Sequence, residues 1–318
     1  MKRREFIVGL TGLATSPLTA RAEQRRMSAL GVLLVGNREP FTTQFFSGLR
    51  DLGYVPQDNV QVEFRSADGK LDRLPALAAE LVALNVDLLI ASETPAVHAV
   101  KRATSHIPIV MAPAGDPVGT GLIASLARPG GNVTGLSAAT AELAGKSLEL
   151  IREILPGARR VAALADPTNS FTKPFVEQIE LSAGIGGFAV QTFMVRTPPE
   201  FETAFAEMAA ARIDAVVVQP TLSRPLAIEQ TLKHRIPSVS GNRAFADGGG
   251  MMSYAASLAD RYRNAAGYVD RILKGAKPED LPVQQPTRFE LVINLKTART
   301  LGVAIPPTLI ARADEVIE

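Results

Sequence analysis

The sequence predicts an α/β protein built from two doubly wound parallel-sheet lobes, and three observations lead to this prediction. The chain has 318 residues, whereas one compact domain usually has about 100–200. From residue 28 onward, short β-branched runs alternate with longer amphipathic stretches, as in parallel strands joined by helices. Two such series flank the glycine-rich segment 130–135, which indicates two lobes of similar architecture.

The first series contains four expected strands and three expected helices. Its strands are continuous Val, Leu and Ile runs, which is typical of strands buried on both faces of a sheet. Its helices carry apolar residues at three- and four-residue spacing. In chain order the expected elements are a strand at 30–35, a helix at 42–52, a strand at 60–64, a helix at 71–84, a strand at 87–91, a helix at 95–103 and a strand at 107–111.

The second series shows the same alternation, and a tail follows it. Its expected elements are a helix at 141–155, a strand at 160–165, a helix at 173–183, a strand at 190–194, a helix at 199–211, a strand at 215–219, a helix at 226–233 and a strand at 237–240. The tail adds a long helix at 260–273, a strand at 289–293 and a short last helix after Pro306-Pro307. This extra helix and strand suit a chain that crosses between the lobes more than once.

Residues 1–22 are expected to be an export signal of the twin-arginine type. Arg3-Arg4 precede Phe6 and Ile7, a short apolar run follows, and Ala20-Arg21-Ala22 forms a small-x-small cleavage site. The apolar run is too short to span a bilayer, which needs about 20 apolar residues. We therefore expect cleavage near Ala22 and a periplasmic protein that does not itself span the membrane. A disordered basic tail or a retained anchor is the alternative.

Composition excludes several partners and chemistries. The formal net charge is +2, and part of the Lys and Arg lies in the segment expected to be removed, so nucleic acid is not expected as a partner. The chain has no cysteine, which excludes disulfides, thiolate metal sites and Cys nucleophiles.

The sequence also offers no arrangement of catalytic residues. The three histidines are His98, His106 and His234, and no neighbouring pattern assigns any of them a catalytic role. Nucleophile-elbow, zinc-protease and P-loop motifs are absent, and the carboxylates near strand ends occur singly. We therefore expect no catalytic residue, no cofactor and no metal, and predict that the protein is not an enzyme.

Candidate ligand-binding residues follow the expected strands of the first lobe, because open α/β sheets bind ligands beyond the carboxyl ends of their strands. Phe41 follows the first strand and offers an apolar wall. Thr94 is expected to cap a helix whose first residue is Pro95, and such a helix start can hold a carboxylate. Asp116 could cap the next helix or accept a hydrogen bond from a ligand ammonium group. Plain capping is the alternative for both Thr94 and Asp116.

The second lobe carries small polar residues at the corresponding positions, namely Asn169, Thr221 and Asn242. Their donors and acceptors suit reversible binding of a small polar or amphipathic molecule. Ordinary turn chemistry is the alternative, because Asn, Asp, Ser and Pro are common in turns anyway.

Ordered segments over nearly the whole mature chain resemble periplasmic substrate-binding proteins of ABC importers, in the group related to the tryptophan/tyrosine-binding type. These segments are DPVGTGL (116–122), RPGGNVTG (128–135), AFADGGG (244–250), MSY (252–254), AGYVDRILKG (266–275) and FELVINLKTA (289–298). The sequence departs from the family pattern after Tyr254, where Ala255 replaces the usual glycine.

The resemblance implies a type I periplasmic-binding-protein fold, with two lobes joined by a three-strand hinge and a cleft that closes on its ligand. We expect lobe 1 to comprise residues 28–138 plus 252–283, and lobe 2 residues 139–251 plus 284–318. The resemblance also implies an inner-membrane ABC permease and its ATPase as partners. In characterised relatives an aromatic amino acid is bound with its carboxylate near the segment that matches Thr94-Pro95.

The resulting hypothesis is a periplasmic receptor that captures a small organic ligand, such as an amino acid or an aromatic acid, by hinge closure. The expected ligand-binding residues are Phe41, Thr94, Pro95, Asp116, Asn169, Thr221, Asn242 and Tyr254, and Asp116→Ala is expected to weaken binding. A periplasmic sensing subunit would have the same cleft and is the main alternative. An exported hydrolase would need a nucleophile–base pair, and a transcriptional regulator would need a DNA-binding helix pair at the front of the chain.

Overall fold

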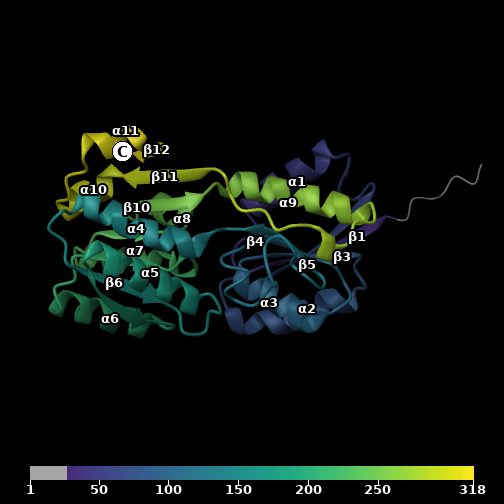
Figure 1. Ribbon diagram of the computed structural model, residues 1–318, viewed down its shortest axis with the longest axis horizontal. Helices are drawn as coiled ribbons and strands as arrows, with labels where there is room; N and C mark the ends of the chain where they lie inside the picture. Colours follow the sequence, from purple (N-terminus) through teal and green to yellow (C-terminus); the bar gives the residue numbers. More distant parts are fainter. Residues whose placement is uncertain (1–26) are drawn as a thin grey trace, which may run out of the picture.

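The computed structural model describes residues 27–318 and confirms the two-lobed α/β fold (Figure 1). The two lobes lie side by side along the long axis, and the chain passes between them three times. The expected export signal at 1–22 lies outside the described residues. No helix within residues 27–318 is both long and apolar enough to cross a bilayer.

Lobe 1 is a five-stranded parallel sheet in the order β2-β1-β3-β4-β5. Its elements are β1 (Ser28–Leu34), α1 (Phe41–Asp51), β2 (Val60–Ser66), the short helix η1 (Leu71–Arg73), α2 (Leu74–Ala83), β3 (Leu88–Ser92), α3 (Thr94–Ala103), β4 (Ile109–Ala114), β5 (Val133–Ser137), and, from the tail of the chain, α9 (Leu258–Leu273) and η3 (Pro278–Asp280).

Helices cover both faces of the lobe 1 sheet, which is why its strands are apolar along their whole length. On one face α2 and α3 pack through residues such as Leu77, Leu81 and Val97. On the other face α1 and α9 pack together, and they run beside each other along the lobe in Figure 1. A long-range segment, α9, therefore completes the core that the first third of the chain begins.

Lobe 2 is a seven-stranded sheet in the order β12-β11-β10-β9-β8-β6-β7, in which β11 and β12 run antiparallel to the other five strands. Its elements are α4 (Thr140–Ile154), β6 (Arg160–Ala165), α5 (Thr172–Gly186), β7 (Ala189–Met194), α6 (Pro198–Ala210), β8 (Ala215–Val218), η2 (Pro220–Leu222), α7 (Pro225–Lys233), β9 (Ser238–Ser240), α8 (Arg243–Asp247), β10 (Met252–Ala256), β11 (Phe289–Asn294), α10 (Leu295–Leu301), α11 (Pro307–Arg312) and β12 (Glu315–Ile317).

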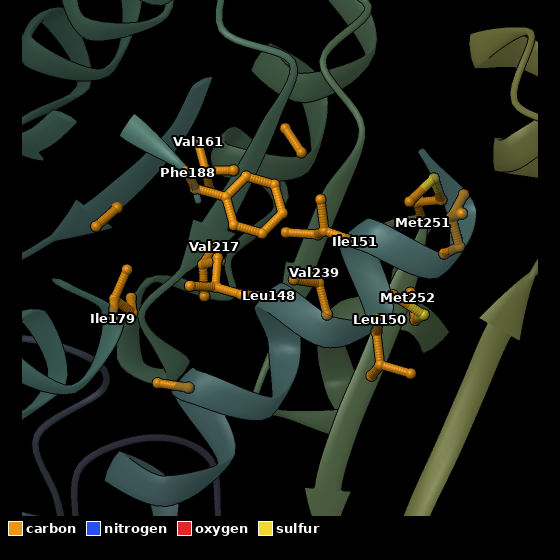
Figure 2. Packing of buried hydrophobic residues seen from close by; sticks show 14 of the residues in the cluster. Leu148, Leu150, Ile151, Val161, Ile179, Phe188, Val217, Val239, Met251 and Met252 are labelled. Carbon is orange, nitrogen blue, oxygen red and sulfur yellow. The ribbon is translucent and has the colours of Figure 1, made fainter. Parts of the chain in front are cut away.

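The largest core of lobe 2 lies between its sheet and the helices α4 and α5. Figure 2 shows Leu148 and Ile151 of α4 gathered with Val217 and Val239 from the neighbouring strands. A second apolar cluster on the opposite face joins α6 and α7 to the same strands. Both lobes are thus three-layered, and each has a core of its own.

The glycine-rich segment predicted as a junction between the lobes leads into an edge strand, β5, which was not predicted from the sequence. Gly135 in this strand has φ +126°, and a Cβ on it would lie 2.5 Å from the backbone N and O of Met111 in β4. Only glycine permits so close an approach. Because glycine has no side chain, it interrupts the run of apolar residues by which a buried strand is recognised in the sequence.

Residues 252–256 correct one expected lobe boundary. They form β10, which pairs with β9 and β11 in the lobe 2 sheet, so the second segment of lobe 1 begins after this strand. The boundary was misplaced because the chain enters α9 of lobe 1 only at Leu258.

Three crossing segments connect the lobes as a hinge. They run from β5 to α4, from β10 to α9, and back to β11 along residues 284–288. Backbone hydrogen bonds tie them to one another, from Ser137 N–H to the Gln284 carbonyl (2.8 Å) and from Ser257 N–H to the Arg288 carbonyl (3.2 Å). The three-strand hinge is therefore confirmed.

Candidate ligand-binding cleft

A cavity of about 110 Å³ lies between the lobes, and in lobe 2 it lies beyond β6 and β8, where the strand order reverses. In lobe 1 the loops after β3 and β4 line it, and an adjoining outer cavity reaches the loop after β1, on the other side of the switch point between β1 and β3. Helix starts and loop amides converge at such a switch point, which favours ligand binding there. The volume is several times the roughly 10–15 Å³ that one water needs, so the cavity admits a small organic molecule.

The lobe 1 wall contains the predicted residues Thr94 and Pro95 at the start of α3. Thr94 is the first helical residue and not the cap, since Glu93 occupies the cap position and makes no side-chain cap bond. The Thr94 hydroxyl instead accepts a hydrogen bond from the Gly115 N–H (3.0 Å), which joins the loops after β3 and β4. The first N–H groups of α3 have no partner within the helix, so this wall suits an anionic group.

The lobe 2 wall contains the predicted residues Asn169, Thr221 and Asn242. The Asn169 amide nitrogen donates to the Thr221 hydroxyl (2.9 Å), which links the loops on either side of the switch point. Asn242 caps α8 by accepting from the Ala244 N–H (3.0 Å) and donates to the Pro220 carbonyl (3.2 Å). These side chains thus stabilise turns and a helix start, as the alternative hypothesis predicts, and they also line the cavity.

Three charged side chains that were not predicted also line the cavity: Glu93, Arg243 and Arg261. Burial lowers the pKa of Arg261 to about 10, which leaves it cationic at neutral pH. Its guanidinium donates to the carbonyls of Ala256 (2.8 Å) and Ser257 (3.2 Å) in the hinge.

Arg243 is held by carboxylates from three elements. Its guanidinium lies 3.3 Å from Asp247 and 3.6 Å from Glu290, and it also pairs with Glu315 of β12. The hydrogen bond with Glu315 is the main reason why the pKa of Arg243 is raised. The C-terminal strand therefore fixes one wall of the cavity.

Glu93 differs from both arginines because its carboxyl group is enclosed by the protein but forms no ion pair with a described residue. Its side chain keeps partial solvent contact at the cavity, but burial still raises its pKa to about 7, against the opposing attraction of Arg224. A carboxyl group that titrates near neutral pH inside a cleft is a common feature of functional sites.

Phe171 and Tyr262 supply the aromatic surface of the cavity. Burial raises the pKa of Tyr262 to about 12, so this hydroxyl stays protonated. Phe41 lies behind Tyr262, with ring centroids 5.0 Å apart, and is only 1% exposed. It lines an adjoining outer cavity and not the main one, because α1 directs its ring into the lobe 1 core.

Two predicted residues, Asp116 and Tyr254, lie outside the main cavity. Asp116 closes a turn by accepting from the Gly119 N–H (2.9 Å). Tyr254 stacks on Phe289, with centroids 6.0 Å apart, and packs against the lobe 2 core. Successive side chains of a strand point to opposite faces, so Ala255, the position of the family departure, lines the cavity in place of Tyr254.

Asp116→Ala should therefore lower the free energy of unfolding by about 1 kcal/mol, the contribution of one turn hydrogen bond. Ligand affinity should change less than about threefold, since Asp116 does not line the cavity. Urea unfolding and calorimetric titration of the purified variant measure the two effects. A tenfold loss of affinity at unchanged stability would return Asp116 to the site.

The missed residues differ in how visible they were. Glu93 stands beside Thr94 in a strand-end segment and could have been found from that position. Arg261 and Tyr262 come from α9, about 170 residues further along the chain, and no local pattern marks them as cleft residues. Within residues 27–318 no group of three or more His, Cys, Asp or Glu side chains could hold a metal ion.

Comparison with known proteins agrees with this geometry. The family described as ABC transporter substrate binding protein matches residues 40–317. The chain belongs to this family.

Individual relatives of this substrate-binding protein span most of its length. The tyrosine-binding protein of Clostridioides difficile is 27% identical over 262 residues, which cover 81% of this chain and 75% of that protein. An ABC domain from Streptococcus pneumonia in complex with L-Trp is 29% identical, with a TM-score of 0.84, covering 91% of this chain and 99% of that one. A conserved domain protein from Vibrio cholerae is 26% identical, with a TM-score of 0.86, covering 92% and 100%.

Proposed function

We propose that this protein is the exported receptor of an ABC importer and that it captures an amino acid with an aromatic side chain between its lobes. The observation that carries the proposal is the cavity between the strand ends of the two lobes, which residues of both lobes line. Relatives that bind tyrosine or L-Trp support the ligand class.

The chemistry of the cavity fits such a ligand. The start of α3 suits a carboxylate, and Arg261, although its guanidinium donates to hinge carbonyls, adds positive charge to the cavity wall. Phe171 and Tyr262 offer apolar surface for a ring. Asn169 and Thr221 add polar groups from the opposite lobe, so one ligand contacts both lobes at once.

Capture would proceed by hinge closure, because a ligand that contacts both lobes favours the state in which they meet. Two contacts mark where they meet. The Arg224 guanidinium of lobe 2 donates to the Gly69 carbonyl of lobe 1 (3.0 Å), and Gly115 of lobe 1 lies against the Phe171 ring. The Arg224 contact lies away from the hinge and is free to break on opening, whereas Gly115 lies beside the hinge, because its carbonyl accepts from the Thr140 N–H (3.0 Å) at the start of α4.

Transport and the periplasmic location are further parts of the proposal. The family membership supports an inner-membrane permease with its ATPase as partners. The Arg3-Arg4 pattern and the Ala20-Arg21-Ala22 site support export before capture.

Mass spectrometry of ligand released from the purified protein, followed by a thermal-shift screen of amino acids and aromatic acids, tests this function. A bound amino acid should raise the melting temperature with its concentration. A protein that releases no small molecule and shows no shift with any compound would contradict the proposal.

Asn169→Ala should weaken binding of the identified amino acid by about tenfold, which corresponds to the loss of roughly one hydrogen bond. The variant also loses the hydrogen bond that holds the Thr221 hydroxyl in place. Asn294→Ala is the matched control, because Asn294 is also a buried lobe 2 asparagine whose side chain accepts a backbone N–H, at the start of α10, but it lies outside the cavity. Equal affinity losses in the two variants would show that Asn169 acts only through the fold of lobe 2.

A further inference from the structure

We propose that Glu93 is a specificity-determining residue, whose carboxylate selects ligands that carry a cationic group and rejects the corresponding simple acids. The inference rests on the proposed function and extends it, since it separates amino acids from aromatic acids. The ammonium acceptor that the sequence suggested at Asp116 would then be Glu93.

Glu93 stands where two cavities adjoin. It lines the main cavity together with Thr94 and Arg261, and it also lines the outer cavity together with Asn37, Asp68 and Arg224. A ligand seated against the start of α3 would therefore lie beside this carboxylate.

The carboxylate has no partner within the described residues, and the nearby cations are all engaged elsewhere. Glu93 makes no side-chain hydrogen bond and no ion pair there. The Arg224 guanidinium donates to the carbonyls of Gly69 and Thr221. Arg261 donates to hinge carbonyls, and Arg243 pairs with its own carboxylates. An enclosed carboxylate left unpaired is unfavourable, and a ligand cation would supply the missing partner.

The backbone holds Glu93 in a conformation that L residues rarely adopt. Its φ is +71° and its ψ 145°, a region that favours glycine. The conformation is fixed from both sides, because the Glu93 N–H donates to the Pro113 carbonyl (2.8 Å) and the Glu93 carbonyl accepts from the Val97 N–H (3.2 Å). The fold thus directs this carboxyl group to the cavity in spite of backbone strain, as ligand-binding sites often do.

A cation beside Glu93 also implies that binding depends on pH. The groups that face Glu93 are Arg224 before α7, Arg243 on α8, Arg261 and Tyr262 on α9, and Glu39 and Asp68 in the outer cavity. Burial raises the pKa of Glu93 to about 7, so the free protein holds a proton there at acidic pH. A cationic ligand must displace that proton, and its affinity should fall about tenfold for each pH unit below 7.

Calorimetric titration with matched pairs of probes tests the inference at pH 6 and pH 8. The pairs are L-tryptophan with indole-3-propionate and L-tyrosine with 3-(4-hydroxyphenyl)propionate, which differ only in the ammonium group. At pH 8 the wild-type protein should bind the amino acid of each pair at least about tenfold more tightly than the corresponding simple acid. This preference should be smaller at pH 6. Glu93→Gln should lose at least about tenfold in affinity for the amino acid, bind the simple acid at least as tightly as the wild-type protein does, and lose the pH dependence.

Glu80→Gln is the matched control, because it makes the same change of charge on the same lobe at an exposed ion pair with Arg65. Circular dichroism and melting temperature establish that Glu93→Gln is folded. Equal binding of both members of a pair, or an unchanged preference in Glu93→Gln, would overturn the inference and leave the receptor function intact. Binding of no probe by any form would contradict the receptor's proposed ligand class and the inference with it.

Discussion

The free energy of unfolding of the ligand-free protein should fall with rising pH by up to about 3 kcal/mol relative to that of Glu93→Gln. Burial raises the pKa of Glu93 from 4.5 to about 7, so the folded state holds this proton more tightly than the unfolded chain. The stabilisation is complete below pH 4.5 and is lost as the pH rises through 7. Each tenfold change in the ionisation constant corresponds to about 1.4 kcal/mol, and partial solvent contact reduces the total.

Urea unfolding of both proteins at several values between pH 4.5 and pH 8 measures this difference. Glutamine does not titrate, so subtraction of the two curves removes the contributions of all other groups. His98 is one such group, since burial lowers its pKa and would act in the opposite direction. Parallel curves for the two proteins would show that the Glu93 carboxyl is well solvated.

Gly115→Val should weaken ligand binding by roughly 100-fold, or about 2.7 kcal/mol, while each lobe stays folded. A Cβ on Gly115 would lie 2.9 Å from the Phe171 ring, and Phe171 is 5% exposed and packed beside Phe175. The ring therefore cannot move away easily, and valine would act as a wedge that keeps the lobes apart. Contacts from lobe 2, including those of Asn169 and Thr221, would then be lost together.

Calorimetric titration gives the affinity of Gly115→Val, and small-angle scattering with ligand shows whether its lobes close. Gly157→Val is the matched control, because Gly157 lies in an exposed loop of lobe 2 with open space around its Cα. Full ligand affinity in Gly115→Val would mean that Phe171 can repack and that closure does not depend on this contact.

Local patterns were sufficient for the parts of the fold that repeat a simple physical rule. Strands buried on both faces are apolar throughout, and helices that cover a sheet carry an apolar stripe, so β1, α2 and β6 stand out. The site residues predicted from strand ends, such as Thr94 and Asn169, follow from the same rule, because parallel strands bring their carboxyl ends to one edge.

Other elements carried no such pattern. In β5, Gly135, which the close approach to β4 requires, interrupts the apolar run, and β10 is a short strand that directly precedes the crossing to α9. For Tyr254 and Phe41 the residue type was suitable, but strand alternation and helix rotation point the side chains into the cores. Which side of an element faces the cleft depends on packing and not on residue type.

The sequence by itself determined that this chain forms two α/β lobes, that small polar residues lie at their strand ends, and that it resembles substrate-binding proteins. Only the tertiary structure decided how the charges of the cleft are arranged, because Glu93, Arg243 and Arg261 come from separate segments of the chain. Whether a charge is paired, buried or directed at a ligand depends on distances between such segments. Those distances are set by how the lobes pack across the hinge.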